Sequence, residues 1–256
     1  MSTDTTDALG NVGPVGDSGA KVALVTGANK GIGLEIARQL GRLGFMVLIG
    51  ARGAERGLAA EQELRAEGLD AVLLLLDVTD QASIDAAARV VEDRYGRLDV
   101  LVNNAAIAID DAPPSLLDVA TLRTTYDTNV FGLFSITKAM LPLLRRSPAG
   151  RIVSMSSGAG SFRETSSPNW RDEWNTLAYN SSKSAVNAIT IHLATELRLT
   201  AIKVNAVNPG YVATDLNDYR GQRTVQQGAI APVRLATLPA DGPTGGFFDE
   251  TGPVPW

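Results

Sequence analysis

The sequence predicts an α/β fold: a single doubly wound domain with a mostly parallel, seven-stranded sheet and helices on both faces. Three observations lead to this fold. Short, continuously apolar runs, which are typical of strands buried on both faces, recur along the chain. Segments whose apolar residues have a helical period separate these runs. A glycine-rich turn follows the first run, at the position where such sheets bind nucleotides.

The composition fits one globular domain and excludes several kinds of function. The 256 residues suffice for one large domain with an extensive core. The net charge is −5 and no basic run stands out, so we expect no nucleic-acid partner. The chain has no cysteine and one histidine, His192, which excludes thiol chemistry and argues against a metal site or a Ser-His-Asp triad. No apolar run approaches the length of a membrane span.

Residues 1–19 differ in composition from the rest of the chain. They are rich in Ser, Thr, Asp and Gly, and they lack the apolar stretch of a signal peptide. We therefore expect a flexible leader, followed by a single domain over residues 20–256. Because the leader carries Asp4, Asp7 and Asp17 and no base, much of the net charge lies outside the fold. A cytoplasmic location is the default expectation.

Strands and helices alternate strictly in the sequence. With right-handed crossovers this order gives a parallel sheet covered on both faces, and no repeat or linker divides the chain. One long helix is expected to be capped by Asp118 and to contain Pro142 near its end. The expected strands cover residues 21–26, 45–50, 71–76, 98–102, 151–155, 202–207 and 245–248.

The turn from Gly27 to Gly33 is a candidate nucleotide site. Its spacing is G-x-x-x-G-x-G, which differs from the general dinucleotide fingerprint. Glycines between a strand and a helix let a pyrophosphate approach the backbone and meet the unpaired N–H groups of the helix. A merely structural turn is the alternative. The position of the turn between a clear strand and a clear helix favours nucleotide binding.

The residues after the second strand indicate which nucleotide binds. An acid there would bind the ribose 2′-hydroxyl of NAD, whereas an arginine accommodates a 2′-phosphate. This chain has Arg52 and no acid in that place, and Lys30 of the glycine turn can reach the same side. Either cation alone could be a solvated surface residue. Together they favour NADP(H) over NAD(H).

Polar residues stand at the ends of the next two strands. Asp77, followed by Val78, could accept a hydrogen bond from an adenine amino group. Asn103 and Asn104 follow the fourth strand, where Asn side chains usually close a turn. Asn129 falls on or beside the inner face of the following helix, and a buried Asn needs hydrogen-bond partners.

Tyr179 and Lys183 lie four residues apart on a predicted half-buried helix over 178–199. Residues at this spacing are neighbours on one helix face. An ammonium beside a phenol favours phenolate and lowers the phenol pKa, which suits a phenolic general acid or base. Chance proximity of two exposed residues is the alternative for this pair taken alone.

Taken together, these residues resemble the short-chain dehydrogenase/reductase family over about residues 21–248, and within it the carbonyl reductases. The likeness to carbonyl reductases lies in Lys30, Arg52 and residues 243–248. Four motifs match in order: Thr26-Gly27-x3-Gly31-Ile32-Gly33, Asn103-Asn104-Ala105, a Ser ending the fifth strand, and Tyr179-x3-Lys183. Further matches are Asp77, Asn129 and Pro209-Gly210-x-Val212-x-Thr214.

The resemblance implies a Rossmann-type domain that transfers hydride between NADP(H) and a small-molecule carbonyl or alcohol. It implies that Tyr179 protonates the carbonyl oxygen, and that Lys183 binds the nicotinamide ribose and lowers the Tyr179 pKa. Asn129 would hold a water that links Lys183 to solvent. Ser157 would donate to the developing oxyanion. Strand alternation separates Ser157 from Ser154 and Ser156, and the family motif ends on the second Ser of the pair.

The resemblance also assigns a set of cofactor-binding residues, which come from the glycine turn, the ends of the strands and the catalytic helix. They are Gly27, Asn29, Lys30, Gly31, Ile32, Gly33, Arg52, Asp77, Val78, Asn104, Ala105, Tyr179, Lys183, Pro209, Gly210, Val212 and Thr214. We expect no metal among the site residues, because the chain has no cysteine and a single histidine.

The sequence departs from the family pattern in two places. Ala106 stands where the family usually has Gly. A short insertion over about 158–176 separates Ser157 from Tyr179 and carries Trp170 and Trp174. Packing within the insertion is the favoured role of this pair, and an aromatic wall over the substrate is the alternative. Long insertions here accompany monomers, so a short one leaves dimer, tetramer and monomer open.

Residues 211–228 fall where the family keeps a mobile substrate lid. The expected activity is reduction of a ketone or aldehyde. The alternatives are an NADP-dependent alcohol dehydrogenase working in the oxidative direction and a non-catalytic NADP(H) sensor. A sensor has no need for Asn129, Ser157, Tyr179 and Lys183 together.

Overall fold

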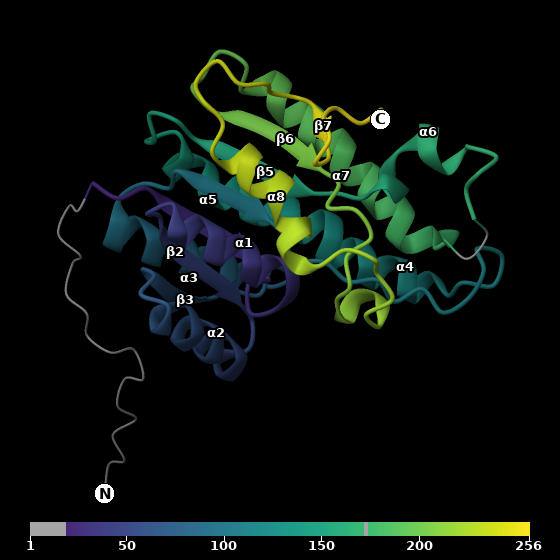
Figure 1. Cartoon of the computed structure of the whole chain (residues 1–256), viewed down its shortest axis with the longest axis horizontal. Coiled ribbons are helices and arrows are strands. Elements are labelled where there is room, and N and C mark those ends of the chain that lie inside the picture. Colours follow the sequence, from purple (N-terminus) through teal and green to yellow (C-terminus); the bar gives the residue numbers. More distant parts are fainter. Residues whose placement is uncertain (1–18, 172–173) are drawn as a thin grey trace, which may run out of the picture.

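The computed structural model describes residues 19–171 and 174–256 (Figure 1). The predicted leader, except Gly19, lies outside the described residues. The described part contains the alternating strands and helices that the sequence predicts. Within 19–171 and 174–256, no helix combines the length and the apolar character that crossing a membrane requires.

Seven parallel strands form one sheet in the order β3-β2-β1-β4-β5-β6-β7. This arrangement confirms the predicted doubly wound fold. Most strand ends lie within one or two residues of those predicted, but the last strand is shorter. Gly245 has a φ of +76°, which is incompatible with an extended strand. The strands are β1 (Val22–Thr26), β2 (Met46–Ala51), β3 (Ala71–Leu75), β4 (Val100–Asn103), β5 (Arg151–Met155), β6 (Lys203–Val207) and β7 (Phe247–Phe248).

The helices cover both faces of the sheet. On one face, α1 lies beside α8 and, with α2, buries one apolar cluster against the strands (Figure 1). On the other face, α3, α5 and α7 bury a second cluster. The helices are α1 (Gly31–Arg42), α2 (Ala54–Ala66), α3 (Gln81–Tyr95), α4 (Val119–Tyr126), α5 (Leu133–Leu144), α6 (Phe162–Thr165), α7 (Leu177–Glu196) and α8 (Val225–Ala236).

The helix predicted after Asp118 is interrupted in the structure. Asp118 caps α4 as expected, because its carboxylate accepts a 2.9 Å hydrogen bond from the Ala120 amide. A π-helical segment, η1 (Asp127–Gly132), then separates α4 from α5. Such wide helical turns are rare in proteins, and those that occur are often found at functional sites. This one carries Asn129, whose side chain is almost fully buried.

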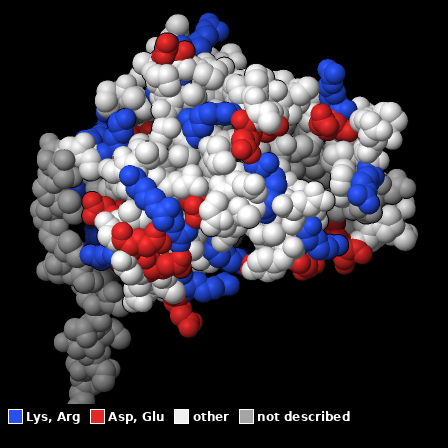
Figure 2. All heavy atoms as spheres, viewed as in Figure 1, with Lys and Arg blue, Asp and Glu red and all other residues white. Residues whose placement is uncertain are grey.

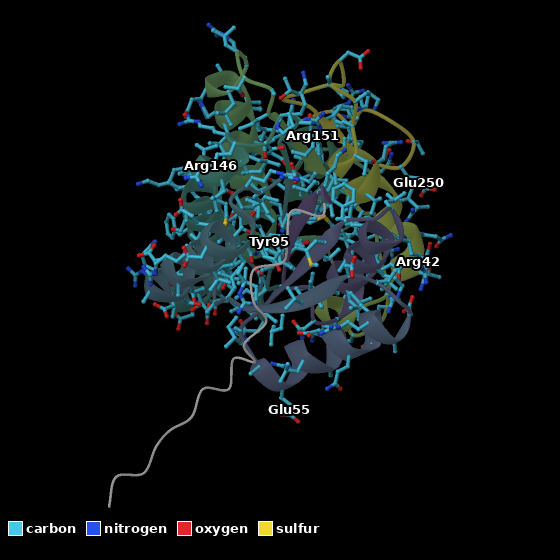
Figure 3. The ribbon with its side chains drawn as sticks, turned by 90° about the vertical axis from the view of Figure 1, so that its left-hand side faces the viewer. Arg42, Glu55, Tyr95, Arg146, Arg151 and Glu250 are labelled. Atoms are coloured by element: carbon cyan, nitrogen blue, oxygen red, sulfur yellow. The ribbon has the colours of Figure 1, made fainter. Side chains whose placement is uncertain are left out.

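A buried arginine at the start of β5 joins this strand to the segment after α8. Arg151, labelled in Figure 3, is 3% exposed, and its guanidinium donates to the carbonyls of Leu238 and Pro239 after α8 and to those of Gly150 and Ala201. Burial lowers the pKa of Arg151. These bonds satisfy a cation that would otherwise be costly to bury. They hold the end of α8 against β5.

Acidic and basic side chains are interspersed over the face that Figure 2 shows. On α1, Arg38 pairs with Glu35, Glu63 and Glu67. Glu63 lies in α2, and Glu67 directly follows that helix. Arg42, labelled in Figure 3, also pairs with Glu67 at 2.7 Å. This network therefore joins two neighbouring helices on one face of the sheet.

Candidate active site

A cleft of about 390 Å³ opens where the strand order reverses. In the sheet, β1 has β2 as its neighbour on one side and β4 on the other. The connections that follow β1 and β4 therefore lead away from each other along the sheet. In open parallel sheets this is the usual place for a ligand. Twelve predicted cofactor residues line the cleft: Gly27, Asn29, Lys30, Gly31, Ile32, Gly33, Arg52, Asp77, Val78, Asn104, Ala105 and Thr214.

The glycine turn is held closely against the loop after β4. The Asn104 side chain donates to the carbonyls of Thr26 and Gly27 at 2.8 and 3.2 Å. The Thr26 hydroxyl accepts from the amides of Asn104 and Ala105. A Cβ atom on Gly33 would meet the Asn104 amide and would lie 2.6 Å from the Gly27 carbonyl. The turn thus needs glycine at this position for close packing, and Asn104 joins it to the loop after β4 instead of closing a turn of its own.

Ala106 does not disturb this loop. Among the described residues, only Asp218 and Tyr219 combine a side chain with a positive φ. Ala106 therefore has a backbone conformation that does not require glycine.

Three cationic side chains line the cleft. Arg52 lies there as predicted, and Arg56 on α2 lines the same part of the cleft. Sequence reasoning missed Arg56, although its position four residues after Arg52 was a usable signal. Lys30 also lines the cleft, but its ammonium forms an ion pair with Asp215. Asp215 also accepts a hydrogen bond from the Tyr219 hydroxyl. Arg52 and Arg56 fit a phosphate dianion.

Asp77 is bonded to Thr79 in this structure, and a hydrogen bond from an adenine amino group stays a prediction. One carboxylate oxygen accepts from the Thr79 amide and hydroxyl, at 2.9 and 2.7 Å. Partial burial opposes ionisation, but these bonds and the charge of Arg52 hold the pKa of Asp77 below its usual range. The residue is therefore ionised at the mouth of the cleft.

The structure brings together three predicted catalytic side chains. Ser157, directly after β5, hydrogen-bonds to the Tyr179 phenol. The Lys183 ammonium lies 5.5 Å from the centre of the Tyr179 ring and donates to the Met155 carbonyl at 2.8 Å. Lys183 is only 3% exposed, while Tyr179 is half-buried. The two residues share a helix face, as their spacing predicts.

Burial decides the pKa values of this pair. It raises the pKa of Tyr179 to about 12, against the lowering effect of the Ser157 hydrogen bond. Burial also lowers the pKa of Lys183 to about 8. The predicted direction for Tyr179 is therefore wrong in this structure. Loss of water around the phenol outweighs the attraction of an ammonium that is directed at Met155.

Asn129 is fully paired with its surroundings. Its amide nitrogen donates to the Ile107 carbonyl and to the Ser182 hydroxyl, at 2.9 and 3.0 Å. Its oxygen accepts from the Ile107 amide at 2.8 Å. Asn129 thus joins a residue that lines the cleft to the helix that carries Tyr179 and Lys183. A water held by Asn129 stays a prediction.

Five predicted cofactor residues do not line the cleft: Tyr179, Lys183, Pro209, Gly210 and Val212. Val212 is 4% exposed and packs against Gly228 of α8, which explains why its side chain is directed away from the cleft. Cleft residues that sequence reasoning missed include Thr128 on η1 and Ile107, Ala108 and Ile109 after β4. The apolar character of residues 107–109 resembled ordinary loop packing and gave no signal.

The predicted lid ends earlier than expected. Thr224 caps α8 and forms a reciprocal pair of hydrogen bonds with Gln227, so residues 225–228 are the first turn of that helix. Within the remaining segment, Asp218 and Tyr219 have φ values of 51° and 59°. A left-handed conformation is unfavourable for a tyrosine. A mobile lid over residues 211–224 stays a prediction.

The insertion has contacts within itself and with the last residues of the chain. The rings of Trp170 and Trp174 meet edge to face with centres 5.4 Å apart, which agrees with packing within the insertion. At its start, the Ser161 hydroxyl donates to the Pro255 carbonyl at 2.8 Å, while Trp256 stacks on Phe247. The last residues of the chain therefore connect β7 to α6.

Comparison with known proteins gives consistent matches. The family described as short chain dehydrogenase matches residues 21–224. Carbonyl reductase (NADPH) 1 of Homo sapiens is 36% identical over 279 residues, covering 93% of this chain and 99% of the relative. Short-chain dehydrogenase/reductase 1 of Saponaria officinalis is 33% identical, covering 92% and 96%.

Solved structures match the fold over nearly the whole chain. An NADPH-bound carbonyl reductase from chicken fatty liver has a TM-score of 0.81 and 28% identity, covering 93% of this chain and 99% of that one. A metagenomic short-chain oxidoreductase in complex with NADP has a TM-score of 0.73 and 32% identity, covering 87% and 93%.

Proposed function

This chain belongs to the short-chain dehydrogenase family, and from that premise we propose that it is an NADPH-dependent reductase of small ketones or aldehydes. The observation that carries the proposal is the cluster of Ser157, Tyr179 and Lys183, joined through Asn129 to a cleft with the features of a dinucleotide site. The enzyme is an oxidoreductase that acts on carbonyl or CH–OH groups, and its cofactor is NADP(H).

The cleft suits this cofactor at both of its ends. The glycine turn leaves the backbone accessible at the N-terminus of α1, where a pyrophosphate would meet free N–H groups. Arg52 and Arg56 would hold the 2′-phosphate. NADPH supplies the hydride when it is bound. The relatives' names and the NADPH- and NADP-bound neighbours support this assignment.

The protein residues supply the proton and hold the substrate oxygen. With a pKa of about 12, the Tyr179 phenol keeps its proton at neutral pH and can give it to a carbonyl oxygen. Ser157 would donate a hydrogen bond to the same oxygen as negative charge develops there. Lys183 would bind the ribose and stabilise the phenolate that Tyr179 leaves behind.

The raised pKa of Tyr179 suits the proton-donor role that reduction needs at neutral pH. Oxidation of an alcohol needs Tyr179 as a phenolate that accepts a proton, and a pKa of about 12 makes this form scarce at neutral pH. The oxidative direction is therefore the second candidate function. Oligomeric state and cytoplasmic location stay predictions.

The proposal is tested by mixing the protein with NADPH and a panel of ketones and aldehydes and following NADPH absorbance. We expect Tyr179→Phe to lower kcat about 10²- to 10⁴-fold, because general acid catalysis is lost, while NADPH affinity stays near normal. Tyr95→Phe is the matched control, because Tyr95 is a half-buried tyrosine on α3 (Figure 3).

Two results would contradict the proposal. A folded, NADPH-binding protein that turns over no carbonyl and oxidises no alcohol would instead be a sensor. Full activity in Tyr179→Phe would remove this residue from the acid role, even if the protein is a reductase.

A further inference from the structure

The helix that carries Tyr179 is capped from a distant loop. Asp110 lies in the segment between β4 and α4, and it is half-buried. One of its carboxylate oxygens accepts from the Ala178 amide at 2.7 Å, and the other accepts from the Tyr179 amide at 3.1 Å. The backbone of Tyr179 is therefore bonded directly to a residue 69 positions earlier in the chain.

The helix does not provide this cap from its own sequence. Thr176 is the N-cap residue of α7, but its side chain makes no hydrogen bond to the helix backbone. Its hydroxyl donates to the Asn180 side chain at 2.9 Å instead. The first amides of a helix have no partner within the helix, and a negatively charged acceptor at that end is especially favourable. Asp110 fills this role at two of them.

The stretch from Asn104 to Asp110 is also part of the wall of the cofactor cleft. Ile107, Ala108 and Ile109 line the cleft immediately before Asp110. At its other end, Asn104 is fixed to the glycine turn through the Thr26 and Gly27 carbonyls. One short loop thus contacts the glycine turn at its beginning and the catalytic tyrosine at its end.

We infer that Asp110 is a positioning residue that fixes Tyr179 relative to the nicotinamide and the substrate carbonyl. This inference rests on the proposed function, in which Tyr179 is the proton donor. Tyr179 stands in the first turn of α7, and helix ends fray. Two hydrogen bonds to a carboxylate hold that turn, and both are charge-assisted. Without them the phenol would occupy a wider range of positions, and a displacement near 1 Å can cost about 100-fold in rate.

The test compares Asp110→Ala, Asp110→Asn and the control Asp80→Ala. Asp80 is a matched cap, because its carboxylate accepts from the Ala82 amide of α3 at 3.1 Å, away from the cluster. We expect Asp110→Ala to lower kcat about 10- to 100-fold with little change in the KM for NADPH. Asp110→Asn should be intermediate, because its amide oxygen keeps one acceptor. Asp80→Ala should lose stability but keep kcat.

A second measurement does not depend on activity. Amide hydrogen exchange at Ala178 and Tyr179 should become faster in Asp110→Ala, and it should stay unchanged in Asp80→Ala. If Tyr179→Phe is inactive but Asp110→Ala keeps the kcat of the wild-type protein, the inference is overturned and the proposed function stays intact.

If instead the wild-type protein reduces no carbonyl, the proposed function fails, and the exchange experiment still decides whether Asp110 holds the first turn. Unchanged exchange at both amides would overturn the inference by itself. A loss of kcat in Asp80→Ala equal to that in Asp110→Ala would also overturn it, because it would reduce the effect to general destabilisation.

Discussion

Tyr179 and Lys183 show how one physical cause acts in opposite directions on two neighbours. Burial disfavours whichever form of a group is charged. The pKa of the phenol consequently rises to about 12, and that of the ammonium falls to about 8. At neutral pH the pair is a neutral acid beside a cation, which is the state that carbonyl reduction needs. Above about pH 8 the cation is lost first.

The buried ammonium of Lys183 should lower the stability of the protein without cofactor. Its folded pKa of about 8 lies below the ordinary value of 10.5, which corresponds to about 3 kcal/mol. Because the unfolded state binds the extra proton between these values, stability rises with pH through this window, and the full cost is present below pH 8. We expect the free energy of unfolding of Lys183→Met to exceed that of wild type by about 1–3 kcal/mol at pH 7, and we expect the variant to be inactive.

This advantage of Lys183→Met should shrink as the pH rises toward 10. Urea unfolding of both proteins at several pH values measures the difference. Lys138→Met on α5 is the control, because Lys138 is exposed. A difference that stays constant from pH 7 to pH 10 would show that Lys183 does not titrate with a lowered pKa.

At the scale of elements, the start of α1 is shaped by contact with the loop after β4. Gly27 and Gly31 have φ values of 63° and 59°, which favour glycine. Gly33 has no such conformation, but it packs directly on the Gly27 carbonyl and the Asn104 side chain. The first turn of α1 and the loop after β4 therefore set the width of the cleft together.

Replacing Gly33 tests this close approach. Alanine ordinarily stabilises a helix by about 1 kcal/mol relative to glycine. Here the added Cβ would lie 2.6 Å from the Gly27 carbonyl, so we expect Gly33→Ala to destabilise the protein by about 1–3 kcal/mol and to weaken NADPH binding. Urea unfolding and a fluorescence titration with NADPH measure the two effects.

Gly41→Ala provides the control in the same helix. Its Cβ would lie 3.2 Å from the Leu69 side chain, which is a milder contact. We expect its free energy of unfolding to stay within about 1 kcal/mol of wild type, with normal NADPH binding. Equal behaviour of the two variants would mean that the cleft does not need glycine at position 33.

The whole molecule is acidic, yet one end of its cleft is cationic. The net charge is −5, while Lys30, Arg52 and Arg56 all line the cleft. Lys30 is engaged by Asp215, so the arginines are the cations best placed for a phosphate. Local arrangement, and not total charge, therefore suits the cleft to NADP(H).

Arg52→Asp should change cofactor preference. We expect NADPH affinity to fall about 10- to 100-fold, because a phosphate contact is lost and a repulsive charge is added, whereas NADH affinity should change only slightly. Titrations with both cofactors measure this. Arg89→Asp is the control, because it makes the same change of charge at an exposed site on α3. Equal losses for NADPH and NADH would contradict the role of Arg52.

The sequence by itself determined the order of the strands and helices, the glycine turn, and the shared helix face of Tyr179 and Lys183. These features depend on residues close together in the chain, through helical period, strand length and glycine conformation. Asp118 as the cap of α4 belongs to the same class, because a cap acts within one turn.

Tertiary structure decided the features that join distant segments. The pairing of Lys30 with Asp215 and the capping of α7 by Asp110 connect residues 185 and 68 positions apart, at separations where no local pattern operates. The direction of the Tyr179 pKa was decided in the same way. A sequence can place a lysine beside a phenol, but the water removed from both is set by the packing of the whole domain.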